Sequence, residues 1–188
     1  MNIDGDHSKS VKQIMKSGIN VYTSPGTAEA LSISGHRLKV VEPLKTFTIG
    51  TFKILAFPTQ HDCAQPYGFL LLSDNGDKIL FATDTYFLKY KFLGLTHILI
   101  EANYSKKILD ESIKSGVTPA FIRNRIMRSH FSLENVKEFF KANDLSAVKE
   151  IYLIHLSANN ICRKTAIKEI KELTGKPTFS FDKEGTNT

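Results

Sequence analysis

The sequence has few cysteines, no long apolar segment and no secretion signal, and each absence excludes a class of protein. Cys63 and Cys162 form no CxxC pair and cannot build a disulfide framework. We expect both to be reduced, half-buried thiols, with a weaker metal-ligand role open for Cys63 because it follows His61 by two residues. No apolar stretch approaches the roughly 20 residues that cross a membrane. The N-terminus is polar and acidic, so we expect a cytoplasmic protein without a membrane partner.

Length and composition are those of one globular domain. The chain has 188 residues, of which 41% are hydrophobic and 23% are charged. It contains no linker, repeat or low-complexity block, so we expect a single domain over residues 1–182 and a disordered tail at 183–188. The net charge of +6 favours polyanionic partners such as nucleic acid. Because Lys and Arg are spread along the chain, a solvated basic surface is the alternative interpretation.

The pattern of apolar residues predicts an α/β protein. Short runs rich in apolar and β-branched residues predict strands at 20–22, 38–41, 46–49, 52–57, 68–72, 78–82, 97–101, 151–154 and 178–181. Asn75-Gly76 separates two of these runs and predicts a hairpin, because glycine tolerates a positive φ. Helical spacing predicts helices at 8–17, 104–114, 120–127, 133–141 and 165–173, and a further helix that ends at Leu31. Strands flanked by helices imply a layered α/β sandwich.

Histidines and carboxylates stand at the ends of several apolar runs. His61-Asp62, Asp84 and His155 each follow a predicted strand, and Asp6-His7 precedes the first predicted helix. Loops at strand ends allow a rigid sheet to present several side chains to one point. Imidazole and carboxylate groups are suitable ligands for zinc and similar divalent ions. Capping of the first helix is the structural alternative for Asp6-His7.

The order of these motifs resembles the metallo-β-lactamase fold superfamily, and in particular its phosphodiesterase and exonuclease-like branch, which includes tRNase Z. The resemblance covers residues 2 to about 181 and is carried by Asp6-His7-Ser8, His61-Asp62, Phe81-Ala82-Thr83-Asp84-Thr85, Ser129-His130-Phe131-Ser132 and Ile154-His155-Leu156-Ser157. It implies an αββα sandwich. Family members have several strands before their first signature, so the resemblance implies a sandwich that is incomplete at the N-terminal strands. A second copy of the chain covering that edge would make a homodimer.

The resemblance also implies a metal centre and its ligands. One site would consist of Asp6, His7, Asp84 and His155, and the other of His61 and Asp84 with Asp4 as an oxygen ligand. Two leading histidines of the family signature are replaced here by Asn2 and Asp4. The implied cofactor is one or two Zn²⁺ ions, or Mn²⁺, because oxygen-rich sites favour harder ions.

The implied activity is metal-dependent hydrolysis, and the implied substrate is a phosphodiester, including those of nucleic acids. Asp6 would orient the attacking water and His130 would protonate the leaving oxygen. A helix-capping or surface role is the alternative for His130. The loss of two signature histidines leaves a second expectation open, in which the chain is an inactive homologue that keeps the fold and binds nucleic acid or a partner. A thioesterase or lactonase is a third alternative, against which the His130 motif argues.

Overall fold

A seven-stranded sheet forms the centre of the structure, a computed structural model in which residues 8–181 are described. Its strands lie in chain order, and β3 to β6 are antiparallel whereas β6 to β9 are parallel. A separate parallel pair is formed by the first two strands. The strands are β1 (Val21–Thr23), β2 (Leu38–Val40), β3 (Thr46–Ile49), β4 (Phe52–Pro58), β5 (Tyr67–Leu72), β6 (Lys78–Ala82), β7 (His97–Glu101), β8 (Glu150–Ile154) and β9 (Thr178–Ser180).

Serine side chains begin three of the helices. Ser24, Ser105 and Ser132 each accept a hydrogen bond from a backbone N–H three residues further along, which satisfies an amide that the helix itself leaves without a partner. The helices are α2 (Val11–Lys16), α3 (Pro25–Ala30), α4 (Lys106–Lys114), α5 (Arg123–Ser129), α6 (Leu133–Ala142) and α7 (Arg163–Thr174), with a 3-10 turn η1 (Ala120–Ile122) before α5.

The predicted elements are all present, with ends that differ by up to three residues; the helix predicted at 8–17, for example, is α2 at Val11–Lys16. Two helix starts differ for identifiable reasons. The helix expected from residue 104 begins at Lys106, because Tyr104 forms a β-bridge with Ser132 instead. The helix expected at 120–127 is divided into η1 and α5, and the first part is a tight turn closed by a hydrogen bond from Ile122 N to Pro119 O of 3.2 Å. The hairpin predicted from Asn75-Gly76 is confirmed by the antiparallel pairing of β5 with β6.

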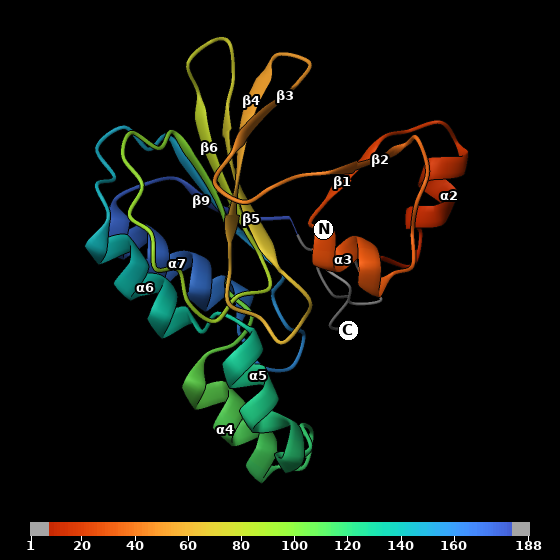
Figure 1. The fold of residues 1–188 in the computed structure, drawn as a ribbon. Helices are drawn as coiled ribbons and strands as arrows, with labels where there is room; N and C mark the ends of the chain where they lie inside the picture. Colours follow the sequence, from red (N-terminus) through yellow and green to blue (C-terminus); the bar gives the residue numbers. More distant parts are fainter. Residues whose placement is uncertain (1–7, 182–188) are drawn as a thin grey trace.

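Two helices cover one face of the large sheet (Figure 1). Alternate residues of β7 and β8, namely Ile98, Ile100, Ile151 and Leu153, are completely buried. They belong to one apolar core with side chains of α6 and α7. The same alternation of strand side chains directs the other residues of these strands to the opposite face.

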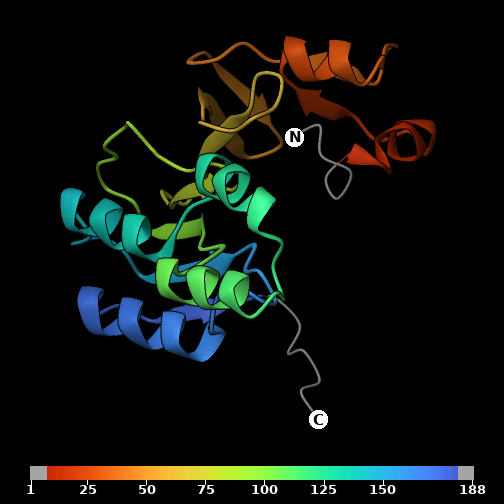
Figure 2. The same ribbon diagram turned by 90° about the horizontal axis from the view of Figure 1, so that it is seen from below.

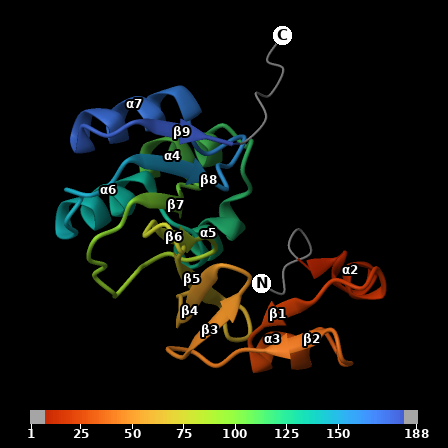
Figure 3. The same cartoon turned by 90° about the horizontal axis from the view of Figure 1, so that it is seen from above.

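The N-terminal part of the described chain forms a small lobe beside the antiparallel end of the sheet (Figures 2 and 3). We call residues 8–41 the small lobe; they comprise α2, β1, α3 and β2. The lobe has its own core around Val11, Val21 and Ile33. It contacts the large sheet through Tyr22, whose ring stacks on Phe47 at a centroid distance of 5.5 Å. Within residues 8–181, every helix is too short or too polar to cross a membrane.

Candidate metal centre

Three strand ends of the parallel half of the sheet meet at one edge. Asp84 lies two residues after β6, Glu101 is the last residue of β7, and His155 directly follows β8. The strand register pairs Ala82 with Ile100 and Glu101 with Ile154, so the three functional side chains lie at the same level of the sheet. This is the consequence of parallel pairing, which aligns the carboxyl ends of neighbouring strands.

Two of these residues have a backbone conformation that residues other than glycine seldom adopt. Asp84 has a φ of 50° and His155 a φ of 56°, both in the left-handed region. Such residues cost about 1–3 kcal/mol each, and they persist where the surrounding structure determines them. The His155 loop is held by Asn103, whose side-chain amide donates to the His155 carbonyl at 3.0 Å and whose carbonyl accepts from Ser157 N at 3.0 Å.

A fourth residue, His130, reaches the same edge from the end of α5. The chain after α5 runs alongside the continuation of β7. Asn103 N donates to Phe131 O at 2.9 Å, and Tyr104 forms the bridge with Ser132. This local extension of the sheet places the His130 ring 5.3 Å from the His155 ring, measured between centroids.

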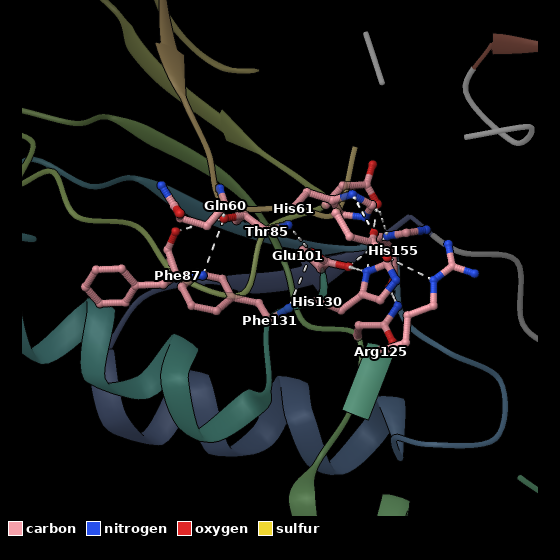
Figure 4. A network of polar contacts seen from close by, with 12 residues as sticks. Gln60, His61, Thr85, Phe87, Glu101, Arg125, His130, Phe131 and His155 are labelled. Carbon is pink, nitrogen blue, oxygen red and sulfur yellow. Dashed lines mark hydrogen bonds and ion pairs between the residues drawn. The ribbon is translucent and has the colours of Figure 1, made fainter. Parts of the chain in front are cut away.

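Glu101 is the centre of the polar network at this edge (Figure 4). Its side chain is completely buried. One carboxylate oxygen, Oε1, lies 2.6 Å from His130 Nδ1 and 2.9 Å from His155 Nδ1. The other oxygen, Oε2, accepts hydrogen bonds from the backbone N–H groups of Thr85 at 3.0 Å and Phe131 at 3.4 Å. Four donors around one carboxylate compensate for its removal from water.

Asp84, Glu101, His130 and His155 form a group that can hold a metal ion. One ligand atom from each residue lies within 4.8 Å of the others, and Asp84 Oδ1 is 3.2 Å from His155 Nδ1. Two imidazoles and two carboxylates are a donor set that suits zinc, manganese or iron. The chemistry of the four side chains therefore fits a divalent metal, without selecting one ion.

His61 lies next to this group and not within it. Its side chain is 1% exposed, and its ring is 5.5 Å from the His130 ring between centroids. His61 Nδ1 is 3.1 Å from Asp62 Oδ1, and Asp62 Oδ2 accepts from Arg125 Nε at 3.1 Å. Burial raises the pKa of the Asp62 carboxyl, but the nearby Ser129 hydroxyl, the charges of His61 and Arg125 and the hydrogen bond from Arg125 outweigh this, so the pKa lies below its ordinary value.

A pocket of about 370 Å³ opens over the group. Three of the four residues line it, and helix α5 and its start supply an opposite wall that is partly apolar and partly basic. Arg125 lines the pocket, and its side chain is 67% exposed although its Nε donates a hydrogen bond to Asp62. The lining residues are Asp84, Asn103, Ile122, Arg125, Ile126, His130 and His155.

The structure brings together four of the residues predicted from sequence, namely His61, Asp84, His130 and His155. Asp4, Asp6 and His7 lie outside the described residues. Cys63, which had a weaker ligand role open, is half-buried and does not belong to the four-residue group.

Glu101 was missed. Like Asp84, Glu101 is a carboxylate at the carboxyl end of an apolar strand, and this position in the sequence could have identified it. None of the motifs that carry the family resemblance contains Glu101.

Comparison with solved structures supports the fold. No family model and no curated protein matches the sequence. Among solved structures, the metallo-β-lactamase fold protein YhfI from Bacillus subtilis is 14% identical with a TM-score of 0.64, over 94% of this chain and 70% of that one. A metallo-hydrolase from the archaeon Ignicoccus hospitalis is 11% identical with a TM-score of 0.66, over 95% of this chain and 72% of that one.

A diphosphatase of the PhnP family is also similar, at 15% identity and a TM-score of 0.53, over 82% of this chain and 57% of that one. The expected α/β architecture is therefore confirmed, with a second sheet that has two strands in the described residues. This chain has the metallo-β-lactamase fold.

Proposed function

We propose that this chain is a metal-dependent hydrolase that cleaves phosphodiester bonds at the edge of the sheet where β6, β7 and β8 end. The observation that carries the proposal is the pair formed by Glu101 and His130 beside Asp84 and His155, in a pocket with an arginine in its wall. This arrangement combines metal ligands, a proton donor and a phosphate contact within one site.

The contacts of Glu101 suggest how the four residues divide their roles. A neutral histidine that donates from Nδ1 carries its lone pair on Nε2. Because Glu101 Oε1 lies beside Nδ1 of both histidines, Nε2 is the nitrogen with which His155 would bind a metal. In this assignment Glu101 fixes the orientation of the rings from behind, as carboxylates commonly do for metal-binding histidines. Asp84 Oδ1 also lies on the Nδ1 side of His155, at 3.2 Å, so Asp84 would join His155 in holding the ion through its other oxygen, Oδ2.

Four further ligands are proposed from the resemblance. His61 would contribute to the same centre, and Asp4, Asp6 and His7 would approach it from outside the described residues. The ion would be Zn²⁺ or Mn²⁺. A bound ion would lower the pKa of a coordinated water to about 7. That water would then supply a nucleophile at neutral pH.

His130 would protonate the oxygen that leaves. Imidazole is suited to proton transfer near neutral pH. The Glu101 carboxylate, 2.6 Å from His130 Nδ1, holds the ring in one orientation. The ring is 22% exposed and lines the pocket, so the proton can reach a substrate bound there.

Arg125 would bind the phosphate. A guanidinium presents paired N–H groups that match the oxygens of a phosphate. Asp62 fixes Arg125 through Nε, which leaves the terminal nitrogens directed to other partners. The overall charge of +6 agrees with an anionic substrate, and one protein of similar structure is a diphosphatase.

The replacement of two signature histidines by Asn2 and Asp4 favours a second candidate, a homologue that binds such substrates without cleaving them. The two candidates differ in turnover, so one experiment separates them. The chain would be stripped with a chelator, loaded with Zn²⁺ or Mn²⁺, and assayed with bis(p-nitrophenyl) phosphate. Turnover that depends on added metal supports the hydrolase. Absence of turnover with metal bound supports the non-cleaving homologue.

The variant His130→Ala tests the role of the proton donor. We expect turnover to fall by about 10²–10⁴-fold while the metal content per chain stays unchanged. His97→Ala is a matched control, because His97 begins β7 at the end opposite Glu101. Loss of metal in His130→Ala would contradict this role and place His130 among the ligands.

A further inference from the structure

A second pocket, of about 580 Å³, lies in the small lobe and has no part in the proposed metal centre. It is formed between helix α2 and the loop that connects α3 to β2. Four of its lining residues, Lys12, Lys16, His36 and Arg37, are basic, and none is acidic. A cavity with positive groups on both walls and no carboxylate in its lining attracts anions.

The basic side chains converge because of the local structure. Lys12 and Lys16 are four residues apart in α2, so they lie on one face of the helix. Opposite them, the guanidinium of Arg37 passes close to Gly18, where an added Cβ would lie 3.9 Å from Arg37 Nη2. Arg37 Nη1 donates to the side-chain oxygen of Asn20 at 3.4 Å. This partner is a neutral amide, so it holds the arginine without cancelling its charge.

The charge of the small lobe is strongly asymmetric. It contains a single acidic residue, Glu29, against five lysines and arginines, namely Lys9, Lys12, Lys16, Arg37 and Lys39. Within residues 8–41, basic side chains therefore outnumber acidic ones by four. Several like charges around one cavity repel each other, and a bound polyanion relieves this repulsion.

The pocket also has apolar and hydroxyl surfaces. Met15 and Ile33 lie among its lining residues, together with Ser32 and Ser34. A simple inorganic anion would make no favourable contact with the apolar lining residues. A nucleotide has both a charged phosphate and a flat, largely apolar base, so its chemistry matches the pocket better.

We propose that this pocket binds the phosphate groups of a nucleotide, either free or within a single-stranded nucleic acid, with Lys12, Lys16 and Arg37 as the phosphate contacts. The proposal does not depend on hydrolytic activity. It does have a structural connection to the metal centre, because α3 is fixed to the loop that follows His61. Gly26 N donates to Gln65 Oε1 at 2.7 Å, and Thr27 Oγ1 donates to Ala64 O at 3.0 Å.

The test measures binding in the presence of a chelator, so that no cleavage occurs. Fluorescence anisotropy of a short labelled oligothymidylate would be recorded as a function of salt for the whole chain and for Lys12→Ala/Lys16→Ala. Each phosphate contact on a single strand contributes about 0.7 to the slope of log K against log salt. We expect the double variant to lower the slope by about 1.4 and the affinity by about tenfold at moderate salt.

Lys164→Ala/Lys171→Ala is the matched control, because it removes two exposed lysines of α7 and changes the net charge by the same amount. It should leave the slope near that of the unchanged chain. Equal effects of the two double variants, or no binding by the unchanged chain, would overturn the proposal. Competition by adenosine monophosphate at the same lysines would identify a free nucleotide as the ligand. Lysine-dependent binding of the oligothymidylate without such competition would identify the single strand.

Discussion

Replacing Glu101 by glutamine tests whether this carboxylate orients the two histidines of the metal centre. The substitution changes one carboxylate oxygen into an NH₂ group and keeps the shape of the side chain. The carboxylate accepts on both oxygens, from the histidine side at Oε1 and from two backbone amides at Oε2. A glutamine keeps one oxygen and turns the other into an NH₂ donor. If the NH₂ faces the backbone, it meets the N–H groups of Thr85 and Phe131. If it faces the histidines, it meets Nδ1 of His130 and His155.

Both orientations weaken the site, by amounts that follow from the contacts. A buried donor left without an acceptor costs about 1–3 kcal/mol. A histidine that changes tautomer to accept from the NH₂ group moves its proton to Nε2, and it then cannot ligate through that nitrogen. Loss of such an orienting carboxylate lowers metal affinity by about 10–100-fold. This corresponds to about 1.4–2.7 kcal/mol of binding free energy.

The measurement is zinc affinity by competition with a chromophoric chelator, combined with nitrogen-15 spectra that report the tautomer of each histidine. Glu150→Gln is the matched control, because Glu150 begins β8 at the opposite end from His155 and accepts from Tyr152 Oη at 2.6 Å. If Glu101→Gln bound zinc as tightly as the unchanged chain, with both histidines still protonated at Nδ1, the assigned role of Glu101 would be refuted.

Two further predictions concern stability. Burial, with a smaller contribution from Glu134, raises the pKa of Tyr104 to about 12. As the pH rises above about 10, the Tyr104 hydroxyl therefore ionises in the unfolded chain before it does so in the folded protein. Up to about 2.7 kcal/mol of unfolding free energy is lost by pH 12. Tyr104→Phe should remove this part of the alkaline loss in urea titrations at about pH 9 and pH 11.5, and an identical loss in both chains would contradict it. Gly68→Ala would place a Cβ 2.4 Å from Phe57 Cζ, so we expect urea unfolding to show a loss of about 1–3 kcal/mol. An unchanged midpoint would mean that the Phe57 ring moves aside without cost.

Local sequence determined most of the secondary structure, because its signals act over a few residues. Strand β3 and strand β6 occupy the residues predicted from their apolar patterns. The turn at Asn75-Gly76 has Gly76 at a φ of 87°, as the hairpin requires. Asp84 and His155 were recognisable for the same reason, since each follows an apolar strand whose end is visible in the sequence.

Tertiary structure alone decided what surrounds each of these residues. Glu101 became the centre of the site because donors from 16 to 54 residues away meet at its carboxylate, and no local pattern encodes such a meeting. The second pocket has the same origin, because Lys16 and Arg37 face one cavity only after α2 packs beside the loop before β2. Sequence fixes which backbone segments become strands and helices through short-range preferences, whereas long-range packing decides which charges share a site.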